Sequence, residues 1–307
     1  MKFEKKFLYF GINAVILMAA PFVTYPVFLM QALCFALFAS AYNLLIGFSG
    51  LVSFGHAAFF AASAYATGYL AKAYSLSPFL SIGVGIAVAT GLGLIMGMLA
   101  IRRHGIYFSM ITLALAQLMY FYFVQASWTG AEDGLQGVPR GTLFGVIDLS
   151  GNLAMYYFIL LLFLIGFGII YRAVHSPFGE VLRAIRENEP RAISLGYDVA
   201  HFKLTAFVLS AAISGLAGSM KVLVSQVASL TDAHWHMSGE VILMTILGGM
   251  GTMVGPIAGA FFVSGLSHYL TGIGSWIIAI TGSIFIVVVM VFRRGFAGEI
   301  LARMHIK

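Results

Sequence analysis

The chain contains 307 residues, of which 61% are hydrophobic and only 9% are charged, whereas soluble domains carry roughly 25% charged residues. This composition excludes a water-soluble globule, and the net charge of +6 reflects basic residues at the ends of apolar segments rather than a nucleic-acid surface. Four long runs contain no Asp, Glu, Lys or Arg. They lie between Lys6 and Lys72, Arg103 and Glu132, Asp148 and Arg172, and Glu240 and Arg293. A membrane-spanning helix needs about 20 mainly apolar residues, so each run holds at least one.

The first apolar run, residues 7–71, predicts three spans. Residues 8–23 lead directly into further apolar sequence without a convincing cleavage site, so we expect an uncleaved first helix rather than a secretory signal. Breaks are expected at residues 24–26 and 47–50, because proline and glycine weaken or end helices. The single cysteine, Cys34, lies in this run and cannot form an internal disulfide.

The remaining apolar segments bring the count to ten spans. Single spans are expected at residues 80–101, 106–125, 153–171 and 202–224, and three more between residues 241 and 292, broken near residues 248–256 and 271–274. With both chain ends inside, fourteen of the seventeen Lys and Arg lie on the inner side, as the positive-inside rule requires, and Lys72, Arg140 and Lys221 lie outside. The sequence therefore predicts an all-α, polytopic membrane protein of about ten transmembrane helices, some of them short or broken.

Small residues recur at three- and four-residue spacing in two of these segments, residues 87–93 and 210–218. In lipid, this spacing lets helices approach each other closely and gain van der Waals contacts. We therefore expect both segments to lie in tight helix contacts.

The polar loop of residues 172–203 is rich in charge and is expected on the inner side. A cap at Ser176, followed by proline, predicts an amphipathic helix to about residue 188. Asn188 or Glu189 is expected to cap a second short helix, which opens with Pro190 and ends before Gly196. Asp198 is expected to cap the next span. Two short helices joined by a sharp turn are typical of a docking surface, although a solvated loop at the membrane surface fits the same residues.

The predicted spans lack the groups that would power transport alone. No charged residue falls clearly within the middle of a span, whereas ion-coupled carriers commonly hold ionisable residues inside the bilayer. The chain also lacks the G-x-x-x-x-G-K-[ST] phosphate loop, so we do not expect it to hydrolyse ATP. The energy source is therefore expected on a partner protein, while a secondary carrier and a passive channel or scaffold stay open as alternatives.

Five stretches, in order along nearly the whole chain, closely resemble the M-type permease subunit of branched-chain amino-acid ABC importers. They are YNLLIGFSGLVSFGHAAFFAASAY (residues 42–65), GIYFSMITLALAQ (105–117), TGAEDGLQGVP (129–139), SPFGEVLRAIRENEPRAISLGYD followed by FKLTAFVLSAAISGLAG (176–198 and 202–218), and ILGGMGTMVGPIAGA (246–260). The resemblance implies a single transmembrane permease domain, residues 1–307, in the bacterial inner membrane, with both termini and the coupling loop (about residues 172–203) in the cytoplasm.

The same resemblance implies an importer subunit for leucine, isoleucine or valine, although related importers carry urea, amides or other neutral amino acids. The chain would be no enzyme and would bind no cofactor, because ATP and Mg stay with two cytosolic ABC ATPases. The other implied partners are a second homologous permease subunit, a periplasmic or lipid-anchored substrate-binding protein and membrane lipid, with no nucleic acid.

Carried onto this chain, the resemblance places the two loop helices in a groove of the ATPase. Closure of the ATPase pair would then move the helices, which act as a lever on the spans. The residues implied in this ATPase coupling are Arg183, Arg186, Glu187, Asn188, Glu189, Arg191, Ala192 and Gly196.

Several polar residues within the predicted spans are candidates for the translocation path. Irregular backbone around glycines is tolerated in a membrane where it lines a cavity. Satisfied polar groups between packed helices explain the same residues equally well. The candidates are Asn43, Ser49, Ser53, His56, Thr112 and Gln117.

Three further motifs give only weak evidence of a functional site. The outer loop at residues 129–135 fits either a contact with the binding protein, a lid over the path or an ordinary turn-rich loop. The glycine run at residues 248–255 lacks the preceding strand and the following acidic residue of a dinucleotide site. His234 and His236 have no further ligands nearby in sequence, so no metal site is expected. No catalytic arrangement can be placed in one aqueous site.

Overall fold

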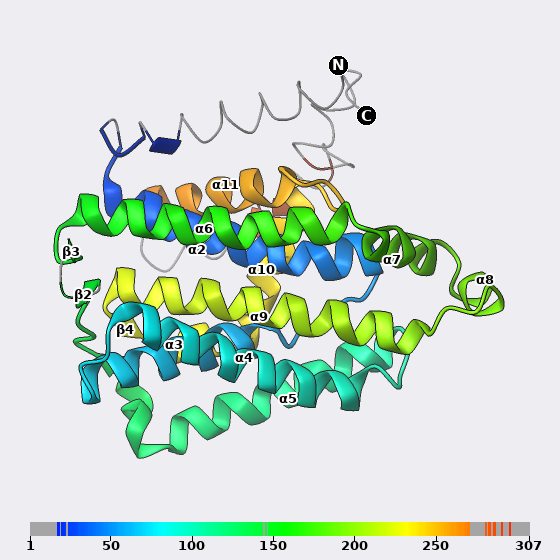
Figure 1. Ribbon diagram of the computed structural model, residues 1–307, viewed down its shortest axis with the longest axis horizontal. Coiled ribbons are helices and arrows are strands. Elements are labelled where there is room, and N and C mark those ends of the chain that lie inside the picture. Colours follow the sequence, from blue (N-terminus) through cyan, green and yellow to red (C-terminus); the bar gives the residue numbers. More distant parts are fainter. Residues whose placement is uncertain are drawn as a thin grey trace.

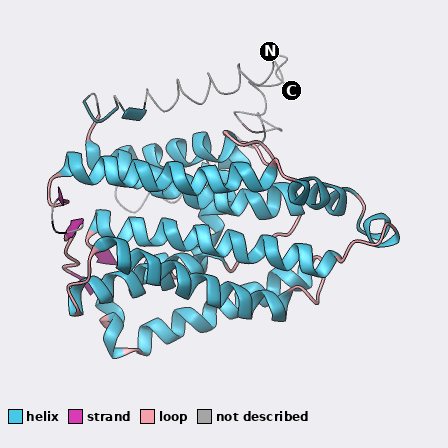
Figure 2. Cartoon of the chain, in the orientation of Figure 1, coloured by secondary structure: helices cyan, strands magenta, loops and turns pink. Residues whose placement is uncertain are grey.

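The computed structural model describes residues 17–18, 20–22, 24–143, 145, 147–270, 280, 282–283, 285–286, 290 and 295. Within this part the chain is almost entirely helical (Figure 2), which confirms the all-α prediction. The first predicted span, residues 8–23, and the last one, before residue 292, lie mainly outside the described residues. The predicted total of ten is therefore not tested.

Most described helices begin and end close to the predicted boundaries, although the helix expected to begin at residue 241 begins at Trp235. They are α2 (Pro26–Asn43), the π-helix η2 (Leu44–Ser49), α3 (His56–Ala73), α4 (Pro78–Ala100), α5 (Ile106–Gln125), α6 (Asn152–Val174), α7 (Pro177–Glu187), α8 (Glu189–Ser194), α9 (Val199–Ser225), α10 (Trp235–Gly248) and α11 (Gly255–Leu270). Short 3₁₀ turns lie at Ala20–Phe22 (η1), Ser127–Thr129 (η3), Ala131–Asp133 (η4) and Leu230–Asp232 (η5).

Five of these helices are long and apolar enough to cross a membrane: α2 together with η2, α4, α5, α6 and α9. The helices α3, α10 and α11 occupy three further predicted spans, but α10 has only 14 residues and α11 only 16. Glycines separate α10 from α11 where the sequence predicted a break. The polytopic membrane class is thus confirmed, with several short helices among the described ones.

The helix α9 lies at the centre of the bundle, between α2 and α6 on one side and α3, α4 and α5 on the other (Figure 1). The apolar stretch of α2 is 89% buried, against 33% for α4 and 22% for α5. The helices α2 and α9 therefore form the core. The helices α4 and α5 lie at the edge and present broad apolar faces, as suits contact with lipid or another membrane chain.

Small residues set the distance between α9 and its neighbours. A Cβ added to Gly218 would lie 2.0 Å from the carbonyl oxygen of Phe60 in α3, and one added to Gly215 would lie 2.4 Å from the Cβ of Ala89 in α4. No side chain fits at such distances, so both glycines are required for the observed helix separation. The predicted tight packing of residues 87–93 and 210–218 is confirmed.

The two ends of the bundle differ (Figure 1). At one, which we call the strand end, β1 (Leu135–Gln136) pairs antiparallel with β4 (Val227–Ala228), and β2 (Thr142–Leu143) with β3 (Ile147–Asp148). The helices α7 and α8 project from the opposite, loop end.

The three basic residues predicted outside all lie at the strand end. Lys72 donates to the carbonyl of Gln136 over 2.8 Å, and Lys221 forms an ion pair with Asp232. Arg140 donates to the side chain of Asn152 over 2.8 Å. Their separation from the basic α7–α8 loop follows the charge asymmetry from which the topology was predicted.

Candidate functional site at the loop end

The α7–α8 loop is a folded unit with the predicted helix–turn–helix form. The side chain of Asn188 accepts a hydrogen bond from the amide of Arg191 over 3.0 Å and caps α8. Gly196, with φ of +88°, ends the unit in the left-handed conformation. Asp198 caps α9 by accepting from the amide of His201 over 3.2 Å. These three predictions are confirmed.

The predicted side-chain cap at Ser176 is wrong. Ser176 occupies the capping position of α7, but its hydroxyl donates to the carbonyl of Ala173 over 2.7 Å and accepts no amide hydrogen from the helix. The preceding helix α6 ends only two residues earlier, at Val174, so an unpaired carbonyl of its last turn lies within reach of the hydroxyl.

The apolar side of the loop packs onto the bundle. Leu182 is fully buried in a cluster that also contains Leu45 and Phe207, and Ile185 joins Ala192 in a smaller cluster under α8. Both loop helices are therefore held against the spans. A movement of these two helices is transmitted to the bundle through the packed side chains, because a close-packed interior deforms little.

The irregular stretch between α2 and α3, residues 44–55, lies directly beneath the loop; we call it the central segment. It consists of the π-helix η2, Gly50 with φ of +73°, and an extended passage to the start of α3. The helix α5 holds this passage in two places. The hydroxyl of Ser109 donates to Val52 O over 2.6 Å, and the hydroxyl of Thr112 accepts from Phe54 N over 3.1 Å. Polar side chains thus satisfy backbone groups that lack a helical partner.

The central segment is also held from the loop and from the turn between α10 and α11. The Arg186 guanidinium of α7 donates to the carbonyl oxygen of Gly47. The side chain of Asn43 accepts from the amide of Gly251 over 2.9 Å and donates to Thr252 O over 2.8 Å. Residues 43–47, from the end of α2 into the central segment, thus connect α7 with the α10–α11 turn.

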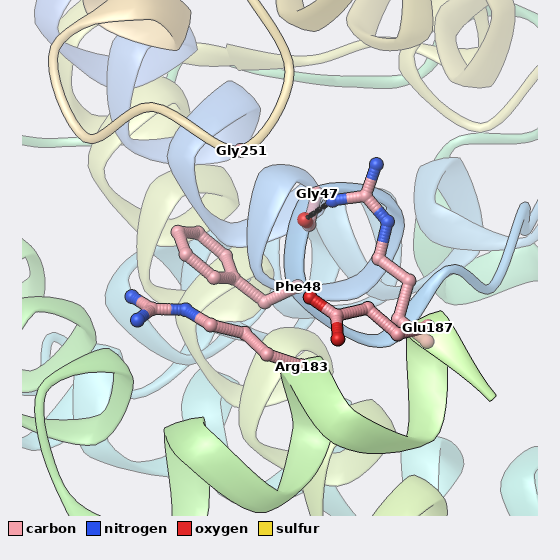
Figure 3. A pocket seen from close by; sticks show the side chains of 6 residues that line it. Gly47, Phe48, Arg183, Glu187 and Gly251 are labelled. Atoms are coloured by element: carbon pink, nitrogen blue, oxygen red, sulfur yellow. Dashed lines mark hydrogen bonds between the residues drawn. The ribbon is translucent and has the colours of Figure 1, made fainter. Parts of the chain in front are cut away.

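A cavity of about 460 Å³ opens between α7 and the central segment (Figure 3). The Arg183 guanidinium lies 5.4 Å from the centre of the Phe48 ring, a cation–π distance, and also pairs with Glu180 at 2.8 Å. The Glu187 carboxylate lines the same cavity and has no ion pair within the described residues. A second cavity of about 190 Å³ also has Arg186 in its wall.

The structure brings five of the six path candidates together around the central segment. Asn43, Ser49, Ser53, His56 and Thr112 are buried, and each has a hydrogen-bond partner within the chain. Gln117 is half-buried on the peripheral helix α5. A role in the path stays a prediction for all six.

The tautomer of His56 follows from its neighbours. The single hydroxyl proton of Ser210 goes to the carbonyl of Ala41 over 2.6 Å, so His56 Nε2, 2.8 Å from the Ser210 oxygen, is the donor in the second bond. The other ring nitrogen, Nδ1, has no hydrogen-bond partner within the described residues. Through this bond the imidazole joins α3 to α9.

The predicted ATPase-coupling residues divide into two groups. Arg183, Arg186, Glu189 and Ala192 contact groups of this chain, Glu189 through an ion pair with Lys203 at 2.7 Å. The exposed members are Arg186, Glu187, Asn188, Arg191 and Gly196, of which Arg186 and Asn188 also form hydrogen bonds within the chain.

Sequence reasoning missed three exposed apolar side chains at the tip of the loop. Ile193, Leu195 and Tyr197 are 58%, 68% and 41% exposed. In the sequence, apolar residues among the charged residues of a polar loop were the signal that could have identified them. Exposed apolar groups on such a projection are typical of a protein contact.

Two of the weaker motifs have structural explanations. The glycine run joins the helices α10 and α11, and a Cβ added to Gly248 would lie 1.8 Å from the carbonyl oxygen of Gly255. These glycines permit close backbone contact and follow no strand. His234 Nδ1 accepts from the amide of His236, and the described residues contain no group of three metal-ligating side chains.

The fold and the site define a multi-pass membrane protein with a two-helix loop held on an irregular segment of its helical bundle. Residues 26–293 match the family described as branched-chain amino acid transport system, permease component. The chain belongs to this family of ABC importer permeases, whose members are not themselves enzymes.

Several curated relatives are similar to the chain. A high-affinity branched-chain amino acid transport system permease protein LivM of Escherichia coli is 28% identical over 72% of this chain and 57% of its own length. A probable LivH permease of Methanocaldococcus jannaschii is 23% identical over 72% of this chain and 73% of its own. The autoinducer 2 import system permease protein LsrC of Salmonella paratyphi B is 26% identical over 64% of this chain and 58% of its own. No solved structure matches the chain.

Proposed function

We propose that the chain is one membrane half of an ATP-driven importer that carries leucine, isoleucine and valine across the inner membrane. The observation that carries this proposal is the folded α7–α8 loop, held on the central segment, in a member of the branched-chain amino acid permease family. The match covers little more than half of the LivM length. The proposed choice of substrate is therefore supported by the family and by the absence of any charged residue from the middle of a predicted span.

The partners follow from the same family. A second, homologous permease pairs with this chain, two cytosolic ATPases bind ATP and Mg, and a periplasmic or lipid-anchored protein delivers the amino acid. The loop end faces the cytoplasm, as do both termini. The apolar face of α5, with Gln117 at its margin, contacts the second permease beside the path, since polar side chains in a membrane turn toward protein or water.

The exposed surface of the loop is the ATPase contact in this proposal. Glu187 and Arg191 present opposite charges, and Ile193 and Leu195 provide apolar area between charged groups. The residues of the loop that face the bundle carry the movement inward. This division suits a lever, which must contact the ATPase on one side and the membrane spans on the other.

The direct test is purification of the chain from its native membranes in mild detergent, with mass spectrometry of the co-purifying proteins. We expect a second permease and two ATPases. The purified complex, reconstituted in liposomes with the binding protein, is expected to import labelled leucine when ATP is supplied. Purification of the chain alone, still able to move solute unaided, would reject the proposal in favour of a carrier or channel.

A second substrate class is favoured by the match to an autoinducer 2 permease and by related importers of urea, amides and other neutral amino acids. Competition separates these classes in the same liposomes. Excess isoleucine or valine is expected to block leucine import, whereas urea, amides and autoinducer 2 leave it unchanged. Strong inhibition by one of the latter compounds would reassign the substrate.

Charge reversal at the loop surface tests the ATPase contact. The changes Glu187→Lys and Arg191→Glu are expected to lower recovery of the ATPase with the permease by about fivefold, because like charges then meet across the interface. Membrane insertion stays normal, since both side chains are exposed. The control Glu132→Lys reverses an exposed charge at the strand end and leaves recovery unchanged. Equal loss in all three variants would show that the loop surface is not the contact.

A further inference from the structure

The contact between Arg186 and Gly47 differs from an ordinary surface interaction. It joins a side chain of α7 to a backbone oxygen of η2, 139 positions earlier in the chain. Gly47 lies in the last turn of the π-helix, where carbonyl groups lose their helical donors. The guanidinium provides the missing donor, and a charged donor makes a stronger bond than a neutral one.

A side chain at position 47 could not replace this contact. A Cβ there would lie 2.2 Å from the side-chain oxygen of Asn43 and 2.7 Å from the amide nitrogen of Gly251. Position 47 therefore has no room for a side chain, and α7 contacts it through the backbone carbonyl. Gly47 therefore also lies close to the α10–α11 turn, which the side chain of Asn43, one turn earlier, binds at Gly251 and Thr252.

The surroundings of Arg186 leave room for α7 and the Gly47 backbone to shift together. The cavities of about 460 and 190 Å³ both have Arg186 in their walls. Figure 3 shows the Glu187 side chain in the larger cavity on the side of the Gly47 carbonyl, and the Arg183 side chain beside the Phe48 ring. Open space on two sides lets the guanidinium and the backbone that it holds move between two positions without repacking the core.

From this geometry we infer that Arg186 is the positioning residue that couples movement of α7 to the central segment and the α10–α11 turn. The inference rests on the proposed function and deepens it by assigning the transmission step to one contact within this chain. It assigns Arg186 to this internal contact rather than to the ATPase surface. Ser49 and Ser53 on the central segment would then move with α7.

The test compares Arg186→Gln and Arg186→Lys with the control Arg172→Gln, which alters an exposed arginine of α6 outside the contact. The complete importer is reconstituted in liposomes, and leucine import and ATP hydrolysis are measured together. For Arg186→Gln we expect normal assembly and hydrolysis but about tenfold less import per ATP, within the usual range for coupling between sites. Lysine still offers a charged donor and is expected to restore part of the loss.

A distance measurement separates coupling from a structural role. Spin labels are placed at Glu180 on α7 and Met250 in the α10–α11 turn, both exposed, in a chain with Cys34 replaced by serine. Nucleotide binding is expected to leave their separation unchanged in the parent chain, since the two move together. With Arg186→Gln, the separation is expected to change with nucleotide.

The possible outcomes separate failure of this inference from failure of the proposed function. Unchanged import per ATP in Arg186→Gln would overturn the inference while leaving the importer proposal intact. Failure of the Arg186 variants to assemble would also overturn it, because the contact would then be structural only. Absence of ATP-driven import in the parent complex would instead reject the proposed function itself.

Discussion

Replacing Gly218 with leucine is expected to prevent the bundle from folding. The position lies in the contact between α9 and α3, where even a Cβ would come within 2.0 Å of the carbonyl oxygen of Phe60 and 2.5 Å of the Ser63 hydroxyl. A leucine forces α9 away from α3 and breaks the packing of the core. Overpacking typically lowers the free energy of unfolding by roughly 1–3 kcal/mol. Here the added side chain would collide with a backbone atom, so we expect a loss of about 3 kcal/mol or more.

The matched control is Gly91→Leu. Gly91 lies on the exposed side of α4, and a Cβ there meets no atom within 4 Å. Leucine is the better helix former and is expected to leave folding unchanged or slightly improved. Fluorescence-detected size exclusion of the solubilised variants measures this, with a monodisperse peak for Gly91→Leu and aggregate for Gly218→Leu. Equal profiles would show that α9 and α3 are not packed as described.

The helices could be predicted because their signals are local. Apolar length and charge position predicted the helices of eight expected spans that fall on described residues, five of which are long and apolar enough to cross a membrane. Pro26, Pro78 and Gly50 lie at the predicted breaks. The caps of α8 and α9 were also predictable, since an Asn or Asp three residues before a free amide is a short-range arrangement. Ser176 was mispredicted because a competing carbonyl of α6 lies beside it.

The candidate site depended on contacts that sequence does not encode locally. The polar residues of the apolar runs were visible, but not that Asn43 reaches Gly251 or that Arg186 reaches Gly47. The π-helix was predicted only as a break, because a wide turn and a chain interruption share the same glycine signal. Pairing over more than 100 positions follows from tertiary packing.

These contacts give the central segment a mechanical role beyond that of a linker. The helices α5 and α7 hydrogen-bond to it, and the α10–α11 turn binds Asn43 immediately before it. It leads into His56 at the start of α3. Irregular backbone held on several sides can shift as one body when one support moves. In the proposed importer, this arrangement places the moving backbone beside the polar residues predicted to form the path.

Exchanging the charges of Glu189 and Lys203 decides which of two roles Glu189 has. The family resemblance implies a contact with the ATPase, whereas the structure pairs its carboxylate with Lys203 at 2.7 Å, and with His104 at 3.7 Å if that ring is protonated. The Lys203 side chain is only 7% exposed and that of Glu189 is 29% exposed. A buried ammonium without a partner is strongly unfavourable, so the pair fastens α8 to α9.

Either single change, Glu189→Lys or Lys203→Glu, is therefore expected to destabilise the protein. Breaking a buried pair costs roughly 3–5 kcal/mol, and the partial exposure of Glu189 places this one near the lower value. Thermal unfolding in detergent measures this loss, and leucine import is expected to fall in parallel because α8 loses its support. The exposed pair of Arg183 with Glu180 is the control, whose exchange changes stability by about 0.5 kcal/mol or less.

The double variant with both charges exchanged gives the decisive result. If the pair acts within the chain, the opposite charges meet again, and we expect most of the stability and import to return, with a coupling energy well above that of the control pair. If Glu189 instead recognises the ATPase, the exchange cannot restore the lost contact. Import then stays low although stability recovers, and Glu189 belongs with Glu187 and Arg191 on the docking surface.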